Sequence, residues 1–155
     1  MQPIVPKIHS LLIKTSKTIA VAESCTGGLL SSLLTRLSGS SQYFILGVIV
    51  YSNKAKQGIL KISPQIIGKI GAVSREVAEK MAESVRKLAK TDFGIGITGI
   101  AGPTGGTPQK PVGTVFIAIA TRHKTICNKF HFTGTRAVIR QKAAIKSLEL
   151  LRKLI

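Results

Sequence analysis

The sequence has few of the residues that stabilise secreted or membrane proteins. It contains two cysteines, Cys25 and Cys127, which form no CxxC pair and give no basis for a disulfide framework. The longest uncharged apolar run, Tyr43 to Tyr51, is too short to cross a bilayer. Charged residues and a histidine interrupt the N-terminal segment IVPKIHSLLIK, which therefore does not resemble a signal peptide. We expect a cytoplasmic protein with no membrane partner.

Acidic residues are also scarce. The chain has six acidic residues and 23 lysines and arginines, which gives a net charge of +17. The excess of basic over acidic residues grows toward the C-terminus. Such a charge indicates either a nucleic acid or phosphorylated ligand, or simply basic, solvated helix faces. We favour the second interpretation, because most of the lysines fall on the expected outer faces of helices and form no run longer than two. The few aromatic residues do not alternate with basic ones, so they offer no platform on which bases could stack.

The usual cofactor and metal motifs are absent as well. The three histidines lack metal-ligand spacing and no P-loop pattern occurs. Residues 94–99, GIGITG, match the dinucleotide pattern GxGxxG, but they fall inside an expected strand and precede a Gly/Pro loop rather than a helix. Close packing of a central strand explains these glycines better. We expect no metal and no cofactor.

The pattern of apolar residues predicts an α/β protein with one domain over residues 1–155. We expect a three-layer α/β/α sandwich with a mixed, mostly parallel five-stranded sheet that contains one antiparallel pairing. The strands are expected at Thr18–Ala22, Tyr43–Ser52, Asp92–Thr98, Val112–Ala120 and Thr125–Phe132. The helices are expected at Ile4–Thr15, Thr26–Leu37, Asn53–Leu60, Ser63–Ile70, Ser74–Lys90 and Thr135–Leu154.

Two of these elements carry specific expectations about burial. The continuous apolar run in Tyr43–Ser52 predicts a strand buried on both faces. In the helix that Ser74 caps, the spacing of Val77, Met81, Val85 and Leu88 predicts the side that packs on the core.

The junction between the first strand and the second helix is the most informative stretch. Its polar tip, Glu23-Ser24-Cys25-Thr26, precedes two glycines, and Glu23 is the only acidic residue among the first 75. A strand that leads into a helix N-terminus places small side chains beside unpaired backbone N–H groups, which can hold an anion or an oxyanion. We expect the chemistry here.

Ser24 is the leading candidate nucleophile. No Asp-His pair is evident to activate it, but a neutral lysine can do so, and Lys56 follows the second strand. Because the ends of parallel strands meet at one edge of a sheet, Ser24 and the Tyr51–Lys56 segment are expected to be neighbours. Alternatively, Ser24 is a helix cap and Lys56 a surface residue. Cys25 is a rival nucleophile without a histidine partner.

A second candidate anion-binding site lies at the start of the last expected helix. Arg136 and Arg140, one turn apart, follow the expected N-cap Thr135, and cations at a helix N-terminus are unfavourable unless an anion relieves them. The glycine- and proline-rich loop that begins at Thr98 has the composition of a shaped pocket wall. We expect a phosphate or carboxylate to bind near the arginines.

The motifs AESCTGG, YSNKAK, GITGIAGPTGG with KPVGTV, and GTRAVIR occur here in this order. Together they closely resemble the CinA C-terminal domain family, which contains nicotinamide-nucleotide amidases, and the similarity extends roughly from Ile8 to Leu151. The resemblance implies a three-layer α/β/α fold with a mixed five-stranded sheet. It also implies hydrolysis of the carboxamide of nicotinamide mononucleotide to nicotinate mononucleotide and ammonia.

Carried over position by position, the resemblance implies Ser24 as nucleophile, Lys56 as general base and Tyr51 as an assisting residue. Glu23 is expected to orient Lys56 or a ribose hydroxyl. The predicted substrate-binding residues are Glu23, Thr26, Gly27, Gly28, Asn53, Thr98, Gly99, Gly102, Arg136 and Arg140. The two arginines are expected on the phosphate, and the backbone N–H groups around Thr26, Gly27 and Gly28 at the oxyanion.

Two alternatives remain open. The chain could be a catalytically silent basic module that keeps the fold and binds nucleic acid or a protein, or an amidase for another phosphorylated carboxamide. We expect a small nucleotide substrate as the main partner, and a homo-oligomer.

Overall fold

The computed structural model describes residues 3–155, so Met1 and Gln2 of the expected domain lie outside it. The helices are α1 (Ile4–Thr15), α2 (Leu29–Leu34), a short 3-10 turn η1 (Ser40–Gln42), α3 (Asn53–Leu60), α4 (Pro64–Ile70), α5 (Arg75–Ala89) and α6 (Arg136–Arg152). The strands are β1 (Ile19–Glu23), β2 (Phe44–Ile49), β3 (Phe93–Gly99), β4 (Thr114–Ala120) and β5 (Thr125–His131). No helix in residues 3–155 has the length and apolar character needed to cross a membrane.

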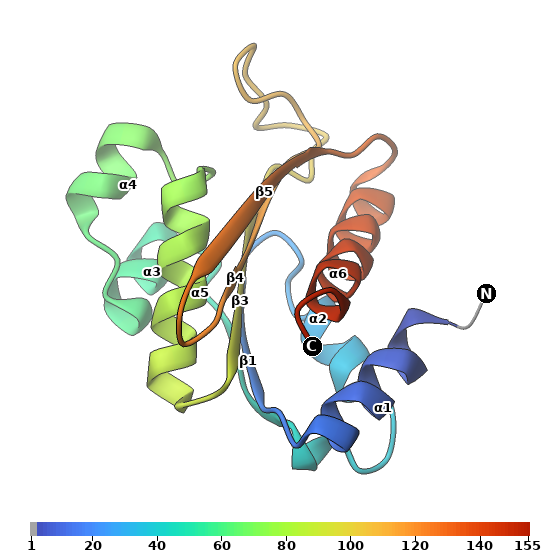
Figure 1. The fold of residues 1–155 in the computed structure, drawn as a ribbon. Helices are drawn as coiled ribbons and strands as arrows, with labels where there is room; N and C mark the ends of the chain where they lie inside the picture. Colours follow the sequence, from blue (N-terminus) through green and yellow to red (C-terminus); the bar gives the residue numbers. More distant parts are fainter. Residues whose placement is uncertain (1–2) are drawn as a thin grey trace.

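The strands form one sheet in the order β2-β1-β3-β4-β5. Helices α1, α2 and α6 cover one face and α3, α4 and α5 the other, so the expected three-layer fold with a mixed five-stranded sheet is confirmed (Figure 1).

The expected single antiparallel pairing is wrong, because there are two. β1 pairs in parallel with β2 and β3, whereas β3–β4 and β4–β5 are antiparallel. Residues 100–113 between β3 and β4 contain no helix that could return the chain for a parallel strand, so β4 runs back along β3. This long loop projects beyond one end of the sheet in Figure 1.

Large and small side chains alternate along the central strands. Isoleucines and valines of β1, β3 and β4 face α1, α2 and α6, whereas alanines and glycines face α5. A Cβ at Gly94 or Gly96 would collide with the backbone carbonyl of Ala82 or Ala78 in α5. The glycines therefore let α5 approach the sheet closely, which confirms the packing interpretation of the GxGxxG match.

β2 is not buried on both faces as expected. It forms an edge of the sheet, its burial alternates along the strand, and Ile45 and Ile49 are 50% and 52% exposed. The apolar run alone does not distinguish an edge strand from a central one, because that depends on what packs against its outer face.

Helix α5 departs from expectation at one position. Ser74 caps it by accepting from the Val77 N–H, and Val77, Met81 and Val85 are buried. Leu88 is 57% exposed. The row of core-facing residues continues every four residues from Val85 to Ala89, which packs partly against the core, so Leu88 falls outside it.

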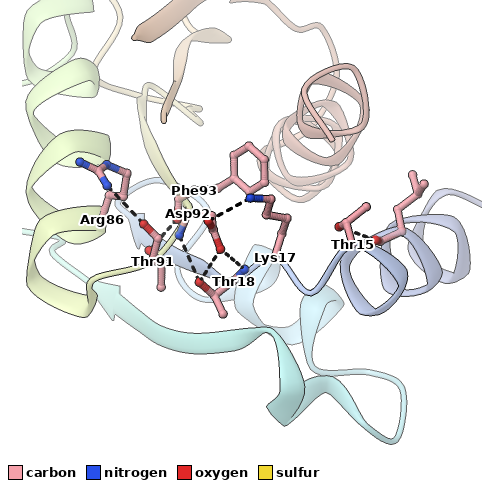
Figure 2. A network of polar contacts seen from close by, with 8 residues as sticks. Thr15, Lys17, Thr18, Arg86, Thr91, Asp92 and Phe93 are labelled. Atoms are coloured by element: carbon pink, nitrogen blue, oxygen red, sulfur yellow. Dashed lines mark hydrogen bonds and ion pairs between the residues drawn. The ribbon is translucent and has the colours of Figure 1, made fainter. Parts of the chain in front are cut away.

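A polar network joins the residues just before β1 and β3, the two central parallel strands, at the end of the sheet opposite the long loop (Figure 2). The Asp92 carboxylate accepts hydrogen bonds from the backbone N–H and hydroxyl of Thr18 and from Lys17, while the Asp92 N–H donates to the Thr18 hydroxyl. Burial by itself raises the pKa of Asp92, but these hydrogen bonds outweigh it and the pKa is lowered. The network fixes the register of β1 against β3.

Candidate active site

The carboxyl ends of the parallel strands β1, β2 and β3 meet at one end of the sheet, where such folds usually bind ligands. A cavity of about 280 Å³ opens there. It is lined by Ser24, Cys25, Tyr51, Asn53, Lys56, Ala72, Val73, Thr98, Gly99, Ile100, Ala101, Gly102, Thr104, Gly105 and Arg136.

Ser24 and Lys56 are in direct contact in this cavity. Lys56 Nζ lies 3.0 Å from Ser24 Oγ, 2.9 Å from the Val50 carbonyl oxygen and 3.2 Å from the Tyr51 carbonyl oxygen. Ser52 caps α3 by accepting from the Ala55 N–H, which brings Lys56 back over the end of β2. The expectation that the two segments are neighbours is confirmed.

The environment of Lys56 favours the neutral amine. The residue is 1% exposed, and burial lowers its pKa, although the nearby Cys25 thiol, if ionised, would raise it. The ion pairs within residues 3–155 join Lys17 to Asp92, Lys80 to Glu83 and Lys146 to Glu149, so no carboxylate of this part neutralises Lys56. Lys56 is therefore neither a surface lysine nor one half of a salt bridge.

Cys25 is poorly suited to be the nucleophile. Its side chain is buried, and burial raises the pKa of the thiol to about 12. A thiol with this pKa is protonated at neutral pH and only weakly nucleophilic. The geometry thus favours Ser24 over its neighbour.

Glu23 takes a structural position instead of the expected contact with Lys56 or substrate. Its fully buried carboxylate accepts from the backbone N–H groups of Gly28, Leu30 and Ser31 and from the Ser31 hydroxyl. These bonds satisfy the first N–H groups of α2, where a negative charge is favourable. Helix α2 therefore starts at Leu29, later than the expected Thr26, and a turn precedes it.

The turn leaves fewer free N–H groups than expected. The Gly27 N–H donates to the Ser24 carbonyl and the Gly28 N–H to Glu23. No oxygen in residues 3–155 accepts from the N–H of Cys25 or Thr26. Of these two residues Cys25 lines the cavity and Thr26 is fully buried, so the Cys25 N–H, rather than those of the glycines, can receive an oxyanion.

Arg136 reaches the cavity from the start of α6, where Thr135 accepts from the Val138 N–H as the expected N-cap. Its guanidinium donates to the Gly102 carbonyl at 2.8 Å and to the Tyr51 hydroxyl at 2.9 Å. Both acceptors are neutral, and no carboxylate within residues 3–155 pairs with Arg136, so its positive charge at the cavity is not compensated by this part of the chain. The Tyr51 side chain contacts this arginine, while its backbone carbonyl contacts Lys56.

Arg140 does not join Arg136. It donates through Nε to the Cys25 carbonyl at 3.1 Å and through Nη2 to the Thr26 carbonyl at 3.0 Å. It lines a separate, mostly apolar groove of about 580 Å³ between α1, α2 and α6. The two arginines expected to bind a phosphate together are therefore separated: Arg136 lines the cavity, and Arg140 lies on the other side of the turn formed by residues 24–27.

The structure thus brings eight predicted residues to the cavity wall: Ser24, Tyr51, Asn53, Lys56, Thr98, Gly99, Gly102 and Arg136. It places five elsewhere: Glu23, Thr26, Gly27, Gly28 and Arg140. Sequence reasoning missed Ala72 and Val73, which precede α5 and are held in place by the Thr98 hydroxyl, a donor to the Ala72 carbonyl. Ordinary apolar residues in a connection carry no signal of such a role.

No group of three or more His, Cys, Asp or Glu side chains in residues 3–155 could hold a metal ion. The polar groups that converge on the cavity are hydroxyls, amides, one amine and one guanidinium. This set suits anionic and carbonyl-containing ligands.

The sequence matches the CinA C-terminal domain over residues 1–155. The chain belongs to the CinA family. A CinA-like protein of Thermotoga maritima is 51% identical over 143 residues, which are 92% of this chain and 35% of that protein. A CinA-like protein of Syntrophotalea carbinolica is 47% identical over 146 residues, 94% of this chain and 35% of that protein. The chain thus spans about a third of the length of these curated relatives.

Solved structures of CinA-family proteins have the same fold. The competence/damage inducible protein CihA from Agrobacterium tumefaciens has a TM-score of 0.95 at 33% identity, over 97% of this chain and 93% of that one. A CinA superfamily protein from Escherichia coli has a TM-score of 0.94 at 32% identity, over 98% and 88% of the two chains.

Proposed function

We propose that this CinA domain is an amidase that hydrolyses the carboxamide of nicotinamide mononucleotide through Ser24 and Lys56. The observation that carries the proposal is the 3.0 Å contact between Lys56 Nζ and Ser24 Oγ in a cavity with no neutralising carboxylate in residues 3–155. The family resemblance supplies the substrate, and the geometry supports an acyl-transfer reaction.

Lys56 acts first as the base. A neutral amine has two N–H groups and one lone pair. The two N–H groups of Lys56 donate hydrogen bonds to the carbonyl oxygens of Val50 and Tyr51. The lone pair then faces the Ser24 hydroxyl and can accept its proton. The two carbonyls thus orient the amine for general-base catalysis.

The reaction proceeds through an acyl-enzyme. Ser24 Oγ forms a bond to the carboxamide carbon as its proton moves to Lys56, and the carbonyl oxygen becomes an oxyanion held by the N–H group of Cys25. The C–N bond breaks as the Lys56 ammonium returns the proton, which releases ammonia. Water then attacks the ester, gives a proton to Lys56, and leaves nicotinate mononucleotide while Ser24 regains its proton.

Arg136 recognises the phosphate in this proposal. It lies on the cavity wall, and its two partners are neutral oxygens that an anion can replace or complement. Gly99, Gly102 and Gly105 lie on the same cavity wall. Asn53, on the same wall, is available to bind a ribose hydroxyl.

The test is release of ammonia from nicotinamide mononucleotide by the purified protein. Ser24→Ala and Lys56→Ala should each abolish it while the far-UV circular dichroism stays unchanged, and Cys25→Ala is the matched control that should retain it. Full activity in Ser24→Ala would reject the nucleophile, and loss confined to Cys25→Ala would assign that role to the thiol.

The competing function is a silent basic module that binds nucleic acid or a protein. The net charge of +17 favours it. DNA binding that weakens steeply with salt, together with no ammonia release from any phosphorylated carboxamide, would support this function instead. The expectation of a homo-oligomer stays a prediction, which light scattering of the purified chain would test.

A further inference from the structure

We propose that two copies of this chain associate through the free edge of β2, so that their two sheets join into one. The sheet ends at β2 on one side and at β5 on the other, and within residues 3–155 the one strand that pairs with β2 is β1. A free edge presents backbone groups to which another strand can add. The inference goes beyond the proposed amidase function and does not depend on it.

The two edges of the sheet differ in charge. On β5, Lys129 and His131 are exposed, and the exposed Lys124 precedes the strand. Charged side chains on an edge strand discourage pairing with another chain. β2 lacks this protection, because residues 43–52 contain no charged side chain in a chain whose net charge is +17. The edge at β2 is therefore where two such basic molecules can meet with the least repulsion.

The edge at β2 is also apolar. Ile45 and Ile49 are 50% and 52% exposed, and Gly47 between them is exposed as well. Residues two apart share a face of a strand, and a Cβ at Gly47 would meet the side chain of Ser31, so this face is the one that α2 packs on. Helix α2 leaves both isoleucines uncovered, and a second strand beside β2 would cover them.

The backbone of β2 has groups free to pair with such a strand. The Val50 N–H donates to the Glu23 carbonyl at the end of β1. Backbone groups of successive strand residues point to opposite sides, so those of Gly47 and Ile49 point outward. No loop within residues 3–155 bonds to them. The register shift against β1 lies between Phe44 and Leu46, which leaves the stretch from Gly47 to Ile49 regular.

The edge is self-complementary about Gly47. In an antiparallel pair with Gly47 opposite the partner's Gly47, Ile45 lies opposite the partner's Ile49, and Ile49 opposite the partner's Ile45. This pairing has a two-fold axis, the commonest symmetry of homo-oligomers, and it gathers four isoleucines into one cluster. An edge of six residues is smaller than the roughly 800 Å² per partner of a typical stable interface, so we expect a dissociation constant in the micromolar range.

The first experiment measures the mass of the purified chain by sedimentation equilibrium from roughly 1 μM to 1 mM. The wild type should change from monomer to dimer over this range. Ile45→Lys and Ile49→Lys should each raise the dissociation constant at least about tenfold, because each places a lysine opposite an isoleucine in the pair. Leu88→Lys is the matched control, since it adds the same charge at a leucine of α5 that is 57% exposed, and it should leave the dissociation constant unchanged.

A wild type that stays monomeric throughout this range would overturn the proposal and leave the edge to a strand from another protein. A dimer that persists when Ile45→Lys and Ile49→Lys are combined would overturn it too. Equal weakening by Leu88→Lys would place the interface elsewhere and also reject the proposal.

Disulfide cross-linking tests the pairing without adding charge. Opposite residues of a hydrogen-bonded antiparallel pair have Cα atoms about 5.5 Å apart, which a disulfide can span. Within one chain, Ile45 and Ile49 are about 13 Å apart along the strand and cannot be bridged. The double variant Ile45→Cys/Ile49→Cys should therefore form a linked dimer in air, seen on a non-reducing gel.

The controls for cross-linking are the two single cysteine variants and the wild type, which keeps Cys25 and Cys127. None of them should cross-link, because the pairing places each new cysteine opposite an isoleucine of the partner. Absence of the linked dimer in the double variant, or equal cross-linking in a single variant, would overturn the proposed pairing.

Discussion

Lys56 Nζ and Ser24 Oγ lie 3.0 Å apart although 32 residues separate them in the chain. β1 and β2 end side by side, and the cap at Ser52 turns α3 so that the lysine points back across the strand ends. The contact depends on neighbouring parallel strands and on one helix start, and it gives the first prediction.

The proposed amidase activity should depend on pH through Lys56. Burial lowers the pKa of this lysine from 10.5, and the neutral form is the base, so kcat/KM should rise with pH and level off above an apparent pKa below 10.5. Lys56→Arg should lose roughly 10²- to 10⁴-fold in kcat at every pH, because a guanidinium does not deprotonate. A pH profile of ammonia release checks both; an unchanged profile in Lys56→Arg would exclude Lys56 as the base.

Arg136→Ala should separate phosphate recognition from chemistry. KM for nicotinamide mononucleotide should rise about tenfold to hundredfold, corresponding to loss of one charge-assisted interaction, while the nucleoside is much less affected. Steady-state kinetics on the two substrates give the answer. Tyr51→Phe, which removes the hydroxyl that Arg136 contacts and keeps the guanidinium, shows how much that contact contributes. An equal effect on both substrates would argue that Arg136 shapes the loop rather than binding phosphate.

Glu23→Gln should destabilise the fold. The carboxylate accepts four hydrogen bonds at the start of α2, and an amide would set its NH₂ against donors. We expect a loss of about 2 to 3 kcal/mol in the free energy of unfolding, measured by chemical denaturation. Ser31→Ala, which removes one of the donors, should lose less. Normal stability with a raised KM would instead support the predicted contact with substrate.

Asp92→Asn should weaken the fold in a pH-dependent way. The folded pKa of Asp92 lies below 3.8, so the native state binds fewer protons than the unfolded chain, and the stabilisation is complete above pH 3.8. It disappears as pH falls through the folded pKa. We expect the variant to be less stable by about 1 kcal/mol at pH 7, since the side chain is partly exposed, and to match the wild type near pH 2. Thermal unfolding across this range checks it, and a constant difference would contradict the assignment.

Much of the fold could be predicted because periodicity and local signals are strong. Ser74 and Thr135 were recognisable as helix caps, and the glycines of β3 as sites of close packing. β2 and Leu88 were placed wrongly for a common reason. An apolar side chain indicates that a position can be buried, but whether another element covers it depends on residues far away in the chain.

Ser24, Lys56 and Arg136 could be named from the sequence by itself, because their residue types and their places at strand ends or helix starts limit the chemistry they can do. Only the tertiary structure showed which charged side chains line the cavity: Lys56 and Arg136 do, and Glu23 and Arg140 do not. The buried Glu23 and the half-buried Arg140 bind backbone groups of the same turn, since peptide N–H and C=O groups removed from water must find partners. That demand depends on three-dimensional packing, and no local pattern of residues reveals it.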